Sequence, residues 1–405
     1  MMQPFKYFYD NKFKENLILL VAAVPFNKEL LSSLTILEKI LNYGCKNYNS
    51  KEKIVAKLED LYGAKVKLTH SCSEKFIHIK LIFGTVDGSL IGDEKLFNDL
   101  CMFVHEYLYD VRLKRFKQKD LEHVKKGLVD TIQSQLNQPG VICKKNLIKA
   151  LDKYDFLVQD SFGSIKEIKE TTLNDVYKTH EMISSLPLSC YVIGPIKENI
   201  AKETLNKYFS IDYVLEVENP SKLPSTKGVE VIKEKNVEQT KVYMLYKYNK
   251  DLFKNTKVSS VFSTILGESG NSKLFKEIRE KKGLCYSISS QINNKYGLLS
   301  ISLGVDQSKA IEAVEAIKTL VSNLNITKEE LFIAKTMHLS GIDSSMEDPF
   351  ALLSALYSHD LLGKVFNYKK IKSDTKKVTL DNLMKLANNL ELVGYSILKG
   401  VKVNE

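Results

Sequence analysis

The predicted order of helices and strands occurs twice along this chain, and this repetition constrains the fold most. In the second half, residues 271–282 have a helical pattern, and Gly283 fits a left-handed C-cap. A strand from Leu284, a period-two strand over 299–305 and a helical pattern over 310–324 follow. Thr327-x-x-Glu330 then predicts a capping box at the start of another helix.

The first half has the same order. A helix is expected over 51–62, ending at Gly63, which lies 220 positions before Gly283. The segment Thr172-Leu-Asn-Asp-Val176 resembles Thr379-Leu-Asp-Asn-Leu383, and the offset of 207 between them indicates an insertion near 84–94. The remaining matches are a strand over 77–83, helices over 97–108 and 119–136, and terminal strands near 191–194 and 395–400.

This duplication predicts an α+β fold of two tandem homologous α/β domains, each with an antiparallel-type sheet covered by helices. A chain of 405 residues suits two or three domains, and 44% hydrophobic with 27% charged residues excludes a disordered chain. Residues 218–228 contain two prolines, two serines and a terminal glycine, so they are the expected linker. The expected domains are therefore 1–217 and 229–405.

The longest apolar run, 17–26, is too short to span a bilayer. Asp10 and Glu15 precede it and no clean cleavage site follows, so we expect a buried first strand rather than a signal peptide, and no membrane partner. The six cysteines are scattered without a CxxC motif, which predicts reduced thiols and a cytoplasmic location.

The formal net charge is +10, but lysine supplies nearly all of it, because the chain has only three arginines, at 112, 115 and 279. The richness in Lys, Asn and Ile is typical of an AT-rich genome, and no basic stripe alternates with aromatics. We therefore expect no nucleic-acid partner; a nucleic-acid binder, the weaker alternative, would show steep salt dependence. An arginine in such a lysine-rich chain is informative.

Residues 269–286 read SGNSKLFKEIREKKGLCY: a loop of small residues, a helix with Arg279, and then Gly283-Leu284-Cys285-Tyr286. Together with the duplication, this segment resembles the pitrilysin/insulinase family of zinc peptidases, and the resemblance covers essentially the whole chain. It implies two domains that close like a clamshell around a central cavity.

Active members of that family bind zinc through an H-x-x-E-H helix and a downstream glutamate. The corresponding positions here hold Thr35, Glu38 and Lys39, and the downstream position falls near Thr131. A protonated lysine has no lone pair to donate to a metal. We therefore expect no metal in this chain, and we expect Glu38, at the general-base position, to be a solvated helix residue.

The resemblance implies that Arg279 and Tyr286 bind the substrate carbonyl and stabilise the oxyanion in trans. The alternative is a surface arginine and a half-buried strand tyrosine without a catalytic role. The seven histidines lack metal-ligand spacing, so each is expected at the surface or satisfied in the core. No nucleotide-binding loop occurs, and 267–271 lacks the final glycine of a serine-hydrolase elbow.

These features predict the non-zinc subunit of a heterodimeric zinc peptidase. Its partner would be a zinc-bearing sister subunit, and its substrates would be peptides that add as a strand to a sheet edge. The motif at 58–64 looks like a group of non-zinc members linked to modification of elongation factor P. The alternative function is a catalytically silent scaffold or assembly subunit derived from the same family.

Overall fold

The computed structural model describes residues 3–109, 116–151, 154, 157, 161–218, 228–253 and 255–400. The chain divides into two compact units. Unit 1 comprises Met1–Gln133, Asp160–Asn219 and Ser345–Phe366. Unit 2 comprises Ser134–Gln159, Pro220–Ser344 and Asn367–Glu405.

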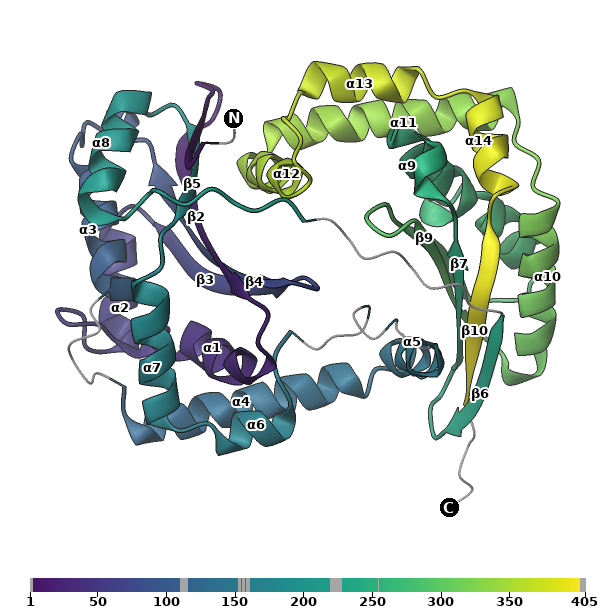
Figure 1. Ribbon diagram of the computed structural model, residues 1–405, viewed down its shortest axis with the longest axis horizontal. Helices are drawn as coiled ribbons and strands as arrows, with labels where there is room; N and C mark the ends of the chain where they lie inside the picture. The colour runs from purple at the N-terminus through teal and green to yellow at the C-terminus, as the bar shows by residue number, and fades with distance from the viewer. Residues whose placement is uncertain are drawn as a thin grey trace. The chain divides into compact units, whose positions relative to one another are not determined.

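Each unit contains one five-stranded sheet, and the two sheets have the same topology (Figure 1). In unit 1 the order is β1-β5-β2-β4-β3, and in unit 2 it is β6-β10-β7-β9-β8. Only the pairs β1–β5 and β10–β6 are parallel; every other pairing in the two sheets is antiparallel. The strands are β1 (Phe5–Tyr9), β2 (Glu15–Pro25), β3 (Lys65–Cys72), β4 (Phe76–Val86), β5 (Ser189–Gly194), β6 (Val229–Lys235), β7 (Thr240–Lys247), β8 (Ser287–Asn293), β9 (Leu298–Val305) and β10 (Glu391–Gly400).

Helices cover both sheets, which confirms the predicted α+β duplication. Unit 1 contains α1 (Lys28–Ile40), α2 (Lys51–Asp60), α3 (Leu96–Tyr109), most of α4 (Gln118–Leu136), α6 (Ile165–Glu170), α7 (Leu173–Ser184), α8 (Glu198–Tyr208) and α12 (Pro349–Leu361). Unit 2 contains α5 (Pro139–Ala150), α9 (Lys257–Ser263), the π-helices η5 (Thr264–Glu268) and η6 (Leu274–Lys281), α10 (Ala310–Ser322), most of α11 (Lys328–Glu347), α13 (Tyr368–Lys376) and α14 (Leu380–Ala387).

The ends of two related helices show the repeat in atomic detail. After α2, the backbone N–H of Ala64 donates to the Leu58 carbonyl at 3.0 Å. After η6, the N–H of Leu284 donates to the Ile278 carbonyl at 3.1 Å. These two residues lie 220 positions after Ala64 and Leu58. Each closure passes through a left-handed glycine, with φ of 71° at Gly63 and 59° at Gly283. Residues that lie 220 positions apart therefore occupy equivalent places in the turns that end these two helices.

The expected division at 218–228 describes the strands but not two of the helices. Residues 219–227 lie outside the described part of the chain. All strands before 218 form the unit 1 sheet and all strands after 228 form the unit 2 sheet. However, α5 precedes the linker and belongs to unit 2, whereas α12 follows it and belongs to unit 1. Each half of the sequence thus supplies one helix to the other half's sheet.

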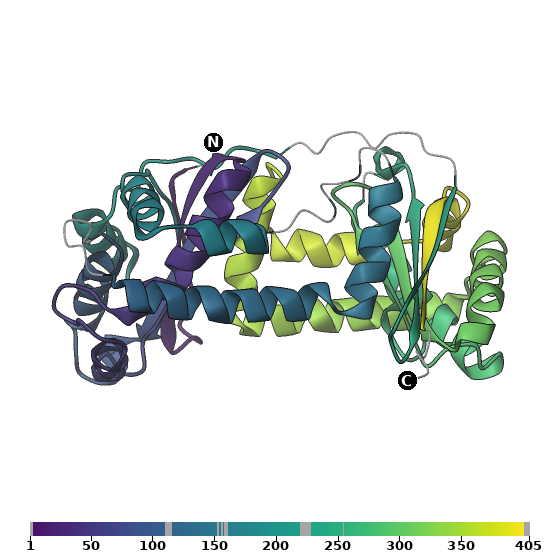
Figure 2. The ribbon, with the colours of Figure 1, turned by 90° about the horizontal axis from the view of Figure 1, so that it is seen from below.

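Packing explains this exchange, because the central strands bury both of their faces. In β7, Val242, Met244 and Tyr246 pack into the core with α9, α10 and α14, whereas Tyr243 and Leu245 pack against α5. Figure 1 shows α5 on one side of this sheet and α10 and α14 on the other, and Figure 2 shows α5 against the strands again.

Unit 1 repeats this arrangement with α12. In β2, Leu17, Leu19 and Val21 share a core with Leu352, Leu353 and Tyr357 of α12. Ile18 and Leu20, on the opposite face of β2, are also fully buried. A strand with two apolar faces must be covered by other elements on both sides of the sheet. Leaving apolar surface exposed to water costs a free energy of about 25 cal/mol per Å².

Candidate functional site

The helix α1 in unit 1 carries Thr35, Glu38 and Lys39, the three positions at which a degenerate metal motif was expected. Asn27 caps this helix by accepting a hydrogen bond from the Glu29 N–H. Thr35 is only 1% exposed, and its hydroxyl has no hydrogen-bond partner among the described residues. Lys39, one turn further along, is exposed to solvent.

Glu38 is not the solvated helix residue that the sequence predicted. Its carboxylate Oε1 lies 2.6 Å from Nδ1 of His70, which comes from the neighbouring edge strand β3. The two side chains are 11% and 2% exposed, so the pair is largely removed from water. The ring Nε2 of His70 also contacts the Ser161 carbonyl. The histidine on β3 thus gives Glu38 a structural partner, and the expectation for Glu38 is corrected.

This pairing changes the protonation of His70. Burial alone would lower the pKa of the imidazole, but hydrogen bonds with Cys72 and Glu38, together with the charge of Glu38, raise its pKa to about 10. His70 is therefore a cation at neutral pH. The carboxylate of Glu38 forms an ion pair instead of acting as a free base.

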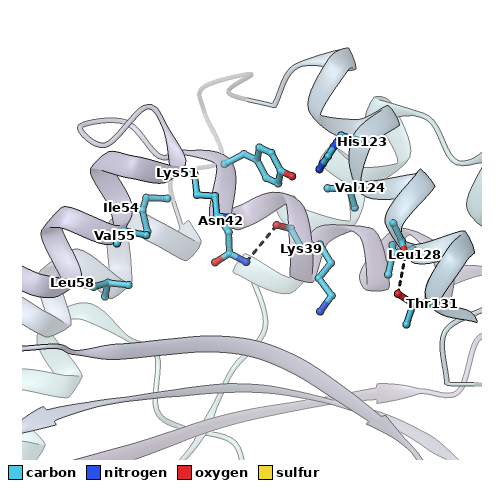
Figure 3. A pocket seen from close by; sticks show the side chains of 12 residues that line it. Lys39, Asn42, Lys51, Ile54, Val55, Leu58, His123, Val124, Leu128 and Thr131 are labelled. Atoms are coloured by element: carbon cyan, nitrogen blue, oxygen red, sulfur yellow. Dashed lines mark hydrogen bonds between the residues drawn. The ribbon is translucent and has the colours of Figure 1, made fainter. Parts of the chain in front are cut away.

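Lys39 and Thr131 line the same pocket, which lies between α1, α2 and α4 in unit 1 (Figure 3). Thr131 is on α4, and its hydroxyl donates to the Gly127 carbonyl of the preceding turn at 2.8 Å. The pocket volume is about 370 Å³. Thr35 and Glu38 are not among its lining residues, so two of the four expected motif positions line this pocket and two do not.

The side chains at these positions do not fit a zinc ion. Structural and catalytic zinc sites use Cys, His, Asp or Glu ligands, usually three or four together. The ligand positions here are Thr35, Lys39 and Thr131, and no group of three or more such ligands occurs among the described residues. Thr35, Lys39 and Thr131 therefore do not supply a set of zinc ligands.

Arg279 lies in the last turn of η6 in unit 2, with an exposed side chain. Its guanidinium group lies over the ring of Phe275, 4.6 Å from the ring centre, which is a cation–π contact. Among the described residues, no carboxylate forms an ion pair with Arg279. Its charge also opposes the rise that burial causes in the pKa of Cys285, the neighbour of Tyr286. Arg279 therefore interacts electrostatically with the segment that contains Tyr286.

Tyr286 lies immediately before the edge strand β8, and its side chain is 57% exposed. Its backbone N–H donates to the Gly304 carbonyl at 2.9 Å, and its hydroxyl donates to Oδ1 of Asp306 at 2.8 Å. The hydrogen bond to Asp306 and the charge of this carboxylate raise the pKa of Tyr286. The phenol therefore stays protonated and can act as a hydrogen-bond donor.

Sequence reasoning missed two partners of these residues. His70 was expected either at the surface or satisfied in the core, without a stated partner, and Asp306 was not considered. His70 is 32 residues from Glu38, and Asp306 is 20 residues from Tyr286. Only the pairing of β8 with β9 brings Asp306, just after β9, near the start of β8. No local sequence pattern could have revealed these pairs.

No helix among the described residues is long and apolar enough to cross a membrane. The predicted apolar first strand, 17–26, is found as β2, one residue shorter at its C-terminal end and two residues longer at its start.

Comparisons with known proteins agree with this structure. Residues 171–337 match the family model "Peptidase M16 inactive domain". The "Probable inactive metalloprotease YmfF" of Bacillus subtilis (strain 168) is 22% identical over 402 residues, which cover 96% of this chain and 94% of that protein.

Solved structures show the same fold. A conserved protein from Enterococcus faecalis V583 has a TM-score of 0.83 at 18% identity, covering 100% of this chain and 98% of that one. The peptidase M16 inactive domain from Pseudomonas fluorescens has a TM-score of 0.73 at 16% identity, covering 98% and 96%. The matched family segment includes Arg279 and Tyr286 and the described part of η6 and β8. The chain is therefore similar over residues 171–337 to the M16 inactive domain, and over nearly its whole length to a probable inactive metalloprotease, in agreement with the predicted resemblance to the pitrilysin/insulinase peptidases.

Proposed function

We propose that this chain is the non-catalytic subunit of a heterodimeric zinc peptidase. A zinc-bearing sister subunit would supply the metal, and this chain would supply Arg279 and Tyr286 to bind the substrate carbonyl. The observation that carries the proposal is a contrast between the two units. Unit 1 holds Thr35, Lys39 and Thr131 where a zinc site needs ligands, whereas unit 2 keeps an arginine and a tyrosine at its surface.

The chemistry of the pair supports this role. Arg279 is exposed and has no ion-pair partner among the described residues, so its donors are available to a ligand. Tyr286 is a neutral donor, because Asp306 raises the pKa of its phenol. A hydroxyl carries one proton, so donation to a substrate requires Tyr286 to leave Asp306. A guanidinium and a phenol can together stabilise the negative charge that develops on a peptide carbonyl oxygen.

The edge strand β8 supports a peptide substrate. It begins at Ser287, next to Tyr286, and among the strands that the structure describes it pairs with β9 alone. The outward backbone groups of an edge strand can pair with an added strand, and main-chain pairing imposes little sequence preference. A peptide on β8 would therefore pass Tyr286.

A role in modification of elongation factor P and a cytoplasmic location belong to the same proposal.

The test is peptide cleavage by the chain mixed with its zinc-bearing M16-type sister. Tyr286→Phe and Arg279→Ala should each lower kcat by about 100-fold, the usual cost of losing one oxyanion donor. The matched controls are Tyr62→Phe, which alters a tyrosine 54% exposed in unit 1, and Lys282→Ala, which removes an exposed cation just after η6. Both controls should cleave at the wild-type rate.

Size-exclusion chromatography of each mixture separates lost chemistry from lost assembly. The proposal requires that Tyr286→Phe and Arg279→Ala still form the heterodimer. If both variants assemble and cleave at the wild-type rate, the chain acts as a scaffold, the alternative function, and the carbonyl-binding role is rejected.

A further inference from the structure

The pocket between α1, α2 and α4 in unit 1 is chemically unlike a metal site (Figure 3). Its lining is mainly apolar, from Ile54, Val55 and Leu58 on α2 and Val124 and Leu128 on α4. Its volume of about 370 Å³ lies within the range of small-molecule sites, about 300–1,000 Å³. Val55 is 45% exposed, although it lines this hollow. The pocket therefore offers uncovered apolar surface to a ligand.

The charges of the lining have one sign. The lining contains Lys39 and Lys51, but no aspartate or glutamate. Neither lysine forms an ion pair or hydrogen bond with a residue that the structure describes. Asp120 acts on the pocket only indirectly: burial and then the charge of Asp120 raise the pKa of Tyr43, whose hydroxyl stays neutral. The pocket combines an apolar surface with free cations.

Most neutral polar groups of the lining are already used within the protein. The Asn42 amide donates toward the carbonyls of Glu38 and Lys39, and its oxygen accepts from Tyr107. Thr131 donates to Gly127. A peptide backbone, which needs partners for both N–H and C=O groups, would find few here. A ligand with one anionic head and an apolar body matches the lining better.

We propose that this pocket binds an aliphatic carboxylate, with Lys39 holding the carboxylate head and α2 and α4 enclosing the chain. The lysine that cannot ligate a metal would then serve as an anion-binding group. Burial of the chain supplies the affinity, and the charged hydrogen bond to Lys39 fixes its direction. This inference does not rest on the proposed peptidase role, because it concerns the isolated chain and a different unit.

The test is isothermal titration calorimetry of the full chain with decanoate as the probe. Octanoate should bind more weakly than decanoate, by up to about fourfold for each methylene removed from the pocket, since a buried CH₂ contributes about 0.8 kcal/mol. Decanol, which lacks the charge, should bind at least about tenfold more weakly than decanoate. Inorganic phosphate should show no binding.

Two variant pairs locate the site. Lys39→Met should weaken decanoate binding by about tenfold, whereas Lys53→Met, at an exposed position of α2 outside the pocket, should leave it unchanged. Val55→Asp should abolish measurable binding, because it places a second carboxylate in the pocket. Its control is Ile200→Asp on α8, where the side chain is 44% exposed, close to the 45% of Val55.

Circular dichroism checks that the variants remain folded; Val55 and Ile200 are surface positions, so both should. The inference is overturned if decanoate does not bind, if decanol or phosphate binds as tightly, or if the pocket variants and their controls behave alike. It is also overturned if a short peptide ending in leucine binds more tightly than decanoate, because the pocket would then recognise a peptide carboxyl terminus.

Discussion

At the scale of single residues, Glu38, which was expected at the general-base position of a degenerate motif, has a partner inside the protein. A general base must be deprotonated and must reach a water molecule, but Glu38 is occupied by His70 at 2.6 Å. Removing one member of a buried ion pair leaves the other charge without compensation, which typically costs about 3–5 kcal/mol. The pair therefore fixes α1 to β3 instead of supporting catalysis.

This ion pair predicts a stability that depends on pH. The pKa of His70 is 6.5 for an ordinary histidine and about 10 in the folded chain, so folding favours the protonated ring. Its contribution is fully present below pH 6.5 and is lost as the pH rises from 6.5 through 10, by up to about 1.4 kcal/mol per pH unit. Urea unfolding at pH 6, 7.5 and 9 measures this loss.

The variant His70→Asn provides the comparison. It should be less stable than the wild type at pH 6, and the difference between the two proteins should shrink toward pH 9. If the difference between the two free energies of unfolding stays constant over this range, folding does not raise the pKa of His70.

At the scale of elements, local sequence signals were reliable where a few neighbouring residues determine the geometry. Thr172 and Thr379 cap α7 and α14 as capping boxes, and the predicted box at Thr327 and Glu330 opens α11. The loop between β4 and α3 is longer than that between β9 and α10, as the insertion near 84–94 predicted. These signals act through hydrogen bonds within one turn, so the sequence contains them in full.

Prediction was less accurate where packing between elements determines where a strand or helix begins. A strand was expected from Leu284, but β8 begins at Ser287. Leu284 and Cys285 are 3% and 8% exposed and belong to the core of unit 2. The π-helical geometry of η5 and η6 was also not predicted, because apolar spacing does not distinguish it from an α-helix.

The glycine caps give a prediction for the two repeats. Gly63→Ala and Gly283→Ala should each lower the free energy of unfolding by about 1–2 kcal/mol, because both residues have left-handed φ angles. A Cβ atom would meet no atom within 4 Å at either position, so the cost is conformational only.

Gly341→Ala, inside α11, is the matched control. A Cβ atom is also free of contacts there, and the change should raise the free energy of unfolding by about 1 kcal/mol through helix propensity. Urea denaturation of the three variants measures their free energies of unfolding. Equal changes at all three positions would show that the left-handed φ angles at Gly63 and Gly283 do not make alanine costly there.

At the scale of the whole molecule, the exchange of α5 and α12 links the two halves of the sequence. Cys143, Leu147 and Ile148 of α5 pack on the unit 2 sheet, and Leu352 and Leu353 of α12 pack on the unit 1 sheet. Neither half of the sequence contains all of its own core. The division at 218–228 thus separates the strands of the two sheets, but not all of the helices that cover them.

We therefore predict that the fragment 1–217 does not fold to a native state. Without α12, the face of β2 with Leu17, Leu19 and Val21 is exposed, and the fragment should bind the dye ANS strongly. A peptide covering 345–366 should lower this dye fluorescence, whereas a peptide covering 134–151, which carries α5, should not. If the fragment neither binds ANS nor responds to either peptide, the unit 1 sheet does not need α12 to cover it, and the prediction is wrong.

The sequence by itself determined the duplicated α+β fold, the helix caps and the apolar strands. All of these depend on residue chemistry or on neighbours within a few positions. The tertiary structure alone decided that Glu38 pairs with His70, that Tyr286 donates to Asp306, and that α5 and α12 cover sheets from the opposite half. Such contacts join residues far apart along the chain, and they depend on strand register and on which apolar face remains to be covered.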